Sequence, residues 1–208
     1  MNSSGCVRQL ISLFFTAFFV TAVFAADFQP REFNLFGEMG KSMTGWHGQA
    51  AFRSIQFELL GRSPFVERWL QKSETGVSLT YSAIHQPRSW FGHRYGDPDD
   101  SVRGEWATLF VRRGWREHAP LQPFVELGTG PMWSNRRVPA ATSRFNFNSH
   151  MGVGTKLFTT RHPIYVTYCF SHISNLAFGD HNPGHAKRNP GWNVNSILLG
   201  TRLRVLRH

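Results

Sequence analysis

Residues 164–174 read IYVTYCFSHIS, and this stretch decides the fold because apolar and polar side chains alternate along it. In a β-strand successive side chains point to opposite faces, so the even-numbered residues from Ile164 to Ser174 share one face. That face is apolar until its last two members, His172 and Ser174. A base and a hydroxyl nucleophile therefore lie side by side on an apolar surface, where polar groups are costly unless they have a function.

Seven further segments show the same period-two alternation, each with one apolar face and one polar or glycine-rich face. An eight-stranded barrel is just wide enough for side chains to fill its interior, and only a closed sheet satisfies a β-backbone in a membrane. We therefore predict an all-β fold, an eight-stranded antiparallel transmembrane β-barrel with its apolar face turned to lipid. The seven segments are residues 33–40, 51–60, 77–84, 105–113, 123–130, 145–158 and 193–206. Charges of both signs are predicted to neutralise one another inside it: Glu38, Glu58, Glu126, Lys156, Arg202 and Arg204.

The N-terminus has the three parts of a secretory signal peptide. Arg8 precedes a Phe-rich apolar run that is short for a transmembrane helix, and small residues follow it. We expect residues 1–25 to be removed and residues 26–208 to form a single outer-membrane β-barrel domain. The mature chain keeps one cysteine, Cys169, so no disulfide framework is expected.

The sequence has a formal net charge of +10, with 14% aromatic and only 17% charged residues. Strong positive charge favours nucleic acid or anionic lipid as a partner. An exported chain meets little nucleic acid, so we expect no nucleic-acid partner and take outer-membrane lipid as the partner. Six tryptophans near segment ends are typical of the aromatic girdles of outer-membrane barrels, although core packing is the alternative for each of them. They are Trp46, Trp69, Trp90, Trp106, Trp115 and Trp133.

The polar residues that end the opening stretch have the chemistry of a serine esterase. A serine hydroxyl needs an imidazole to take its proton, and the imidazole needs a third group to orient it. His172 and Ser174 are close enough on one strand face to form such a pair. Asn193, in phase with the apolar face of the next strand, can lie across the hairpin from His172. Asn175 supplies an amide donor beside the nucleophile, as an oxyanion hole requires. The alternatives are a turn residue at Asn175 and a strand-start residue at Asn193.

These residues resemble the PagL family of lipid A 3-O-deacylases. The resemblance rests on His172-Ile173-Ser174-Asn175, on the eight-segment layout and on the later run Asn189-Pro190-Gly191-Trp192-Asn193. It implies an outer-membrane carboxylic ester hydrolase that removes an acyl chain from lipid A or lipopolysaccharide without a cofactor. By the family's Ser-His-Glu triad, His172 would be the base, Ser174 the nucleophile and Asn175 the oxyanion donor. The position of the triad Glu is occupied by Asn193, which can orient a histidine but carries no charge.

Two alternatives to the enzyme remain at this point. The first is a non-catalytic outer-membrane barrel of the same scaffold with a lipid-binding or structural role, which the uncharged Asn193 favours. The second is a soluble periplasmic lipid-binding barrel whose apolar face points inward. Asp180 is the nearest loop acid that can substitute for the triad Glu, but with His181 and His185 it has no spacing typical of a metal site, so no metal is predicted. We expect a monomer.

Overall fold

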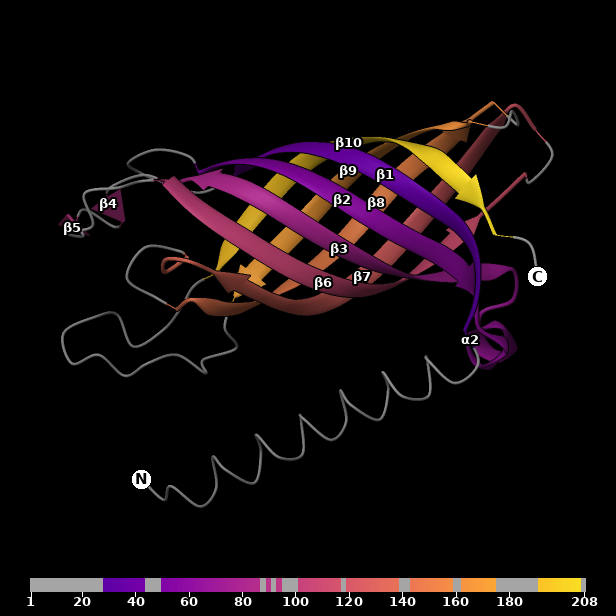
Figure 1. Cartoon of the computed structure of the whole chain (residues 1–208), viewed down its shortest axis with the longest axis horizontal. Coiled ribbons are helices and arrows are strands. Elements are labelled where there is room, and N and C mark those ends of the chain that lie inside the picture. The colour runs from indigo at the N-terminus through magenta and orange to yellow at the C-terminus, as the bar shows by residue number, and fades with distance from the viewer. Residues whose placement is uncertain are drawn as a thin grey trace, which may run out of the picture.

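The structure is a computed structural model that describes residues 28–43, 50–86, 89–90, 93–94, 101–116, 119–138, 143–158, 162–174 and 191–206. Its long strands are β1 (Gln29–Ser42), β2 (Ala51–Arg62), β3 (Ser73–His85), β6 (Ser101–Gly114), β7 (Leu121–Ser134), β8 (Phe145–Leu157), β9 (Ile164–Ser174) and β10 (Trp192–Val205). They form one closed antiparallel barrel in the order β1-β10-β9-β8-β7-β6-β3-β2 (Figure 1). The predicted eight-stranded antiparallel barrel is confirmed.

Three short elements lie outside the barrel wall. Helix α2 (Pro64–Trp69) joins β2 to β3 and begins at a proline, whose fixed φ suits the first turn of a helix. The two-residue strands β4 (Ser89–Trp90) and β5 (His93–Arg94) pair with each other. None of the helices in the described residues is long and apolar enough to cross a membrane.

The strand bounds follow the sequence pattern closely. Strand β9 coincides with the predicted segment, whereas β1, β3 and β6 begin at Gln29, Ser73 and Ser101, before the alternation becomes clear. The pairing of β1 with β2 shifts register between Pro30 and Glu32, which blurs the period-two pattern at that end. In a closed barrel each strand pairs on both sides, so pairing extends the strands past the residues that alternate cleanly.

The apolar face of the barrel points outward. The exposed large apolar side chains lie on seven of the eight strands, all but β6, so the outer wall resembles a lipid-facing band rather than the surface of a soluble sheet. The soluble periplasmic barrel with an inward apolar face is therefore the wrong alternative. The exposed set includes Met39, Ile55, Phe57, Leu79, Tyr81, Val125, Leu127, Met151, Val153, Tyr168, Ile197 and Leu199.

The barrel interior is filled by a charged group surrounded by aromatic rings. Arg112 donates to both oxygens of Glu58 at 2.8 and 3.0 Å and to Oε2 of Glu126 at 2.8 and 3.0 Å. Its guanidinium, in a side chain 3% exposed, lies 4.6 Å from the centroid of the Phe124 ring. Phe124 in turn packs where a Cβ on Gly154 would be, so the glycine-rich inner faces make room for bulky side chains.

The predicted neutralisation of interior charges is confirmed in part. Glu32 accepts from Arg202 at 2.7 Å and lies 3.5 Å from Lys156. The prediction for Arg204 was wrong, because this side chain is exposed: β1 and β10 shift register between Phe33 and Asn34, which changes the face of the residues beyond. Arg112, the centre of the interior ion pairs, was missed.

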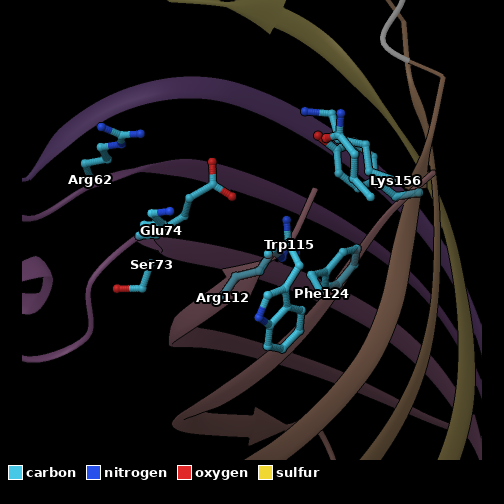
Figure 2. A pocket seen from close by; sticks show the side chains of 11 residues that line it. Arg62, Ser73, Glu74, Arg112, Trp115, Phe124 and Lys156 are labelled. Atoms are coloured by element: carbon cyan, nitrogen blue, oxygen red, sulfur yellow. The ribbon is translucent and has the colours of Figure 1, made fainter. Parts of the chain in front are cut away.

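A cavity of about 200 Å³ lies inside the barrel at the end nearest α2. Figure 2 shows the side chains that line it, with Arg112 and Phe124 beside Trp115, and Arg62 and Lys156 at the edges of the view. Both ends of the described chain lie on the α2 side of the barrel, whereas the end of β9 and the start of β10 lie at the opposite rim (Figure 1).

The tryptophan prediction is confirmed only for part of the set. Trp69, Trp115 and Trp133 are exposed near the ends of α2, β6 and β7. Trp106 is buried inside the barrel, so its place in an outer girdle was wrong; the even-numbered residues of β6 face inward. Trp46 and the side chain of Trp90 lie outside the described residues, as does the predicted signal peptide.

Candidate active site

The hairpin of β9 and β10 places two of the predicted residues directly opposite each other. His172 pairs in register with Asn193, and Nδ1 of the imidazole lies 2.8 Å from Oδ1 of the amide. An amide oxygen only accepts hydrogen bonds, so Nδ1 carries the proton and donates it. In the neutral ring this tautomer leaves the lone pair on Nε2, which is the form that a general base requires.

Ser174 follows on the same outward face of β9, at the end of the strand. Two residues along a strand separate the Cα atoms by about 7 Å, a gap that a serine and a histidine side chain can bridge. Within the described part of the chain, no hydrogen bond joins Ser174 Oγ to the imidazole, and the serine is 8% exposed. Catalytic hydrogen bonds are often long before substrate binds, so this geometry is compatible with the predicted pair.

Gly191 packs against the edge of the imidazole that bears Nε2. Its φ is +69°, a conformation that glycine adopts without strain. A Cβ at this position would lie 2.6 Å from His172 Cε1 and 2.9 Å from Nε2. The residue before β10 therefore has to be a glycine for two reasons, backbone conformation and close approach to the ring.

Two hydroxyl groups that the sequence analysis missed continue the site across the wall. Ser149 on β8 pairs in register with His172, and Thr129 on β7 pairs with Ser149. Thr129 Oγ1 and Ser149 Oγ lie 2.8 Å apart, and both side chains are exposed on the outer wall. We call Thr129, Ser149, His172 and Asn193 the polar row. Its signal in the sequence is the interruption of an apolar face by Ser149.

The polar row crosses a wall that is otherwise apolar. Leu127 and Met151, its neighbours on the outward faces of β7 and β8, are 62% and 53% exposed. On the other side of the hairpin, an apolar groove of about 690 Å³ runs over Gly37 between β10, β1 and β2. No atom lies within 4 Å of the position a Gly37 Cβ would take. Ile197 and Leu199 form one edge of this groove.

Three predicted features lie outside the described residues: the oxyanion residue Asn175, the substitute acid Asp180 and the loop histidines. Cys169 is buried and faces the interior, opposite His172, as its phase on β9 predicts. The described residues contain no group of three or more His, Cys, Asp or Glu side chains placed to hold a metal ion. The 200 Å³ interior cavity lies at the end of the barrel away from His172, so it is not part of this site.

Comparisons with known proteins agree with the fold and the resemblance. A family model described as lipid A 3-O-deacylase (PagL) matches residues 54–202, which include the whole polar row. The crystal structure of Neisserial surface protein A (NspA) is 9% identical, with a TM-score of 0.55 over 83% of this chain and 95% of that one. The crystal structure of the outer membrane enzyme PagL is 12% identical, with a TM-score of 0.51 over 82% of this chain and 99% of that one. No curated protein matches the sequence.

Proposed function

The chain belongs to the PagL family of lipid A 3-O-deacylases and is an outer-membrane barrel, and on this premise we propose that it is a serine esterase that removes an ester-linked acyl chain from lipid A or a similar lipid. The observation that carries the proposal is the 2.8 Å hydrogen bond between His172 and Asn193 on the lipid-facing wall, next to Ser174. An oriented base beside a serine is the minimum that ester hydrolysis by this route requires.

The reaction follows from the roles of these groups. Ser174 Oγ attacks the ester carbonyl while His172 Nε2 takes its proton, and the side-chain amide of Asn175 donates to the oxyanion that forms. His172 then returns the proton to the leaving alcohol of the lipid, which leaves an acyl group on Ser174. Water, deprotonated by the same nitrogen, releases the fatty acid. Asn193 acts throughout by holding the ring and its tautomer.

The position of the site suits a substrate that never leaves the membrane. The lipid enters laterally, with its ester at the rim and its tail along the outer wall. From Asn193 to Ile197 is four residues on β10, or about 13 Å, so an acyl chain that starts near Ser174 is long enough to reach the groove over Gly37.

A second candidate is a non-catalytic barrel with a lipid-binding or structural role. The observation that favours it is the amide at residue 193, because an amide cannot stabilise an imidazolium by charge as a carboxylate does. Against it, nucleophile–His–Asn arrangements are catalytic in other hydrolases, where the amide supplies orientation alone.

Expression in a Gram-negative host tests the choice. Lipid A is extracted and analysed by mass spectrometry from cells with the wild type, Ser174→Ala or the control Ser171→Ala, which changes an inward hydroxyl on the same strand. The enzyme predicts that one acyl mass is lost with the wild type and with Ser171→Ala but not with Ser174→Ala. Unchanged lipid A in all three strains would support the non-catalytic barrel, and a loss in all three would exclude Ser174 as the nucleophile.

A further inference from the structure

The cavity at the α2 end of the barrel has no role in the reaction just described. It has a volume of about 200 Å³ and lies among side chains at the strand ends near α2. At the opposite rim the interior is filled by buried apolar side chains that pack together, among them Phe52, Ile84, Trp106, Met132 and Trp192. A ligand would therefore reach the cavity from the α2 end.

Connection lengths tell which compartment this end faces. Outer-membrane barrels have short turns on the periplasmic side and longer loops outside the cell. At the α2 end, β6 and β7 are joined by residues 115–120, and β8 and β9 by residues 158–163. At the opposite rim the longest connections are residues 86–100 and 175–191. The cavity thus opens to the periplasm, where small water-soluble molecules reach it, whereas the proposed esterase site lies at the outer rim (Figure 1).

Glu74 brings a carboxylate without a close partner to this cavity. It is the second residue of β3, it lines the cavity, and its side chain is half-buried. Figure 2 shows its carboxylate directed away from β3, towards the space between Arg62 and Lys156. Among the residues that the structure describes, none forms a hydrogen bond or an ion pair with it. Such a carboxylate has lost part of its water without gaining a donor, so it marks a place for a cationic group.

The cations around Glu74 are not equally available. Arg112 and Lys156 attract it at longer range but are already paired with other carboxylates, and Arg62 is paired with a carboxylate of α2. Lys72 also lines the cavity, and in the described part of the chain nothing pairs with its ammonium group. Lys72 and Glu74 are two residues apart, or about 7 Å, and do not pair with each other. The cavity therefore offers a neighbouring base and acid, which together are complementary to a molecule with an ammonium and a carboxylate close together.

Aromatic rings and the size of the cavity limit the rest of such a molecule. Trp115, Phe124 and Tyr165 line the cavity, and Trp115, which is 44% exposed and follows the last residue of β6, lies towards its mouth. Aromatic rings pack against apolar groups and attract cations to their faces. A cavity of roughly 150 Å³ holds benzene, so this one suits a molecule of about six to ten heavy atoms.

We propose that this cavity binds a free α-amino acid with an apolar or aromatic side chain. Glu74 accepts hydrogen bonds from the ammonium group, and Lys72 donates to the carboxylate. The side chain of the ligand packs against Trp115 and Phe124. Each charged contact is expected to raise the affinity tenfold or more. The inference does not depend on the proposed esterase, because the two sites lie at opposite ends of the barrel.

Three forms of leucine test the site in the purified, detergent-solubilised protein by isothermal titration calorimetry. L-Leucine has both charges, N-acetyl-L-leucine keeps only the carboxylate, and L-leucinamide keeps only the ammonium group. The wild type is expected to bind L-leucine at least tenfold more tightly than either derivative. No saturable binding of L-leucine, or equal binding of the three forms, would overturn the proposal.

Single substitutions assign the two charges. Glu74→Gln is expected to weaken binding of L-leucine at least tenfold without weakening N-acetyl-L-leucine, and Lys72→Gln to weaken L-leucine without weakening L-leucinamide. The matched controls are Glu105→Gln and Lys41→Gln, which remove the same charges at exposed positions towards the other rim and should bind as the wild type does. Heat-modifiable migration in electrophoresis checks that each variant folds. An equal loss in a control would mean that net charge governs binding, and would refute the assigned site.

Ser174→Ala separates this site from the proposed function. The variant is expected to bind L-leucine with the affinity of the wild type, because the serine lies at the other end of the barrel. Loss of binding in Ser174→Ala would place the amino acid at the outer rim and overturn the assignment. A wild type that hydrolyses no ester but binds L-leucine through Glu74 would support the cavity site while counting against the esterase.

Discussion

Restoring a carboxylate next to the imidazole is the change most informative about the site. In Asn193→Asp the side chain keeps its size, and a carboxylate oxygen replaces the amide oxygen 2.8 Å from His172 Nδ1. A hydrogen bond to a charged group contributes roughly 1.5–3 kcal/mol, against about 0.5–1.5 kcal/mol for a neutral one. The carboxylate gains this difference only when the ring becomes an imidazolium, as it does in the transition state. We therefore expect a gain of about 1–2 kcal/mol, or roughly 5–30-fold in kcat.

The assay is hydrolysis of 4-nitrophenyl decanoate by the purified protein, with kcat and KM measured separately. Asn195→Asp is the matched control, because Asn195 lies two residues further on the same face of β10 and accepts from Tyr168 instead of His172. The charge it adds lies about 7 Å further along the strand and makes no hydrogen bond to the ring, so the gain in kcat should be smaller than in Asn193→Asp. An equal gain in both variants would mean that general charge is responsible. No gain, or a loss, in Asn193→Asp would refute the role of residue 193 as the group that orients the base.

The other predictions concern Gly191 beside the imidazole, the apolar groove over Gly37 and the barrel interior. Gly191→Ala should lower kcat by tenfold or more, because its Cβ would lie 2.6 Å from His172 Cε1. The control Gly114→Ala should leave kcat unchanged, because its Cβ would meet no atom closer than 3.8 Å. Heat-modifiable migration in electrophoresis checks that both variants fold. Gly37→Leu should fill the groove and raise KM for long-chain esters, with little effect on butyrate esters; equal effects on both chain lengths would argue against the groove as the acyl site. Arg112→Met should destabilise the barrel by about 3–5 kcal/mol, measured by urea unfolding in detergent, because it leaves two buried carboxylates without a cation. An unchanged unfolding midpoint would contradict that reasoning.

The sequence predicted most of the fold because a membrane barrel has period two on both of its faces. Most outward residues are apolar and many inward residues are small or polar, so phase alone assigns the faces of β2, β8 and β9. The pattern failed where adjacent residues of the same kind blurred the phase. Arg112 and Arg113 follow each other in β6, and only the alternation of Leu109 and Val111 before them places Arg112 on the inward face. The inward Trp106 on the same strand was misassigned because its place near a segment end, and not its phase, was taken as the sign of a girdle.

The site was predicted only as far as one hairpin determines it. His172 and Asn193 were predicted to lie opposite each other because they flank the connection of β9 to β10, and the phase of both strands was readable. Ser149 and Thr129 come from strands whose register against β9 depends on pairing around the barrel, which the sequence of one strand does not encode. A cross-strand row of polar residues is a property of the closed sheet, and the sequence shows only isolated breaks in apolar faces.

The contrast between the two faces of the wall argues for where the chemistry occurs. Inside the barrel the charged side chains of Arg112 and Glu32 have partners at hydrogen-bond distance, and aromatic rings fill the space around Arg112. This pairing leaves no free base or nucleophile among these groups. On the outer wall the opposite holds: within the described residues His172 uses one nitrogen in a hydrogen bond and keeps Nε2 for a proton. A polar group that is costly in lipid thus keeps one atom without a partner, which is the condition that a lipid-facing base would have to meet before substrate arrives.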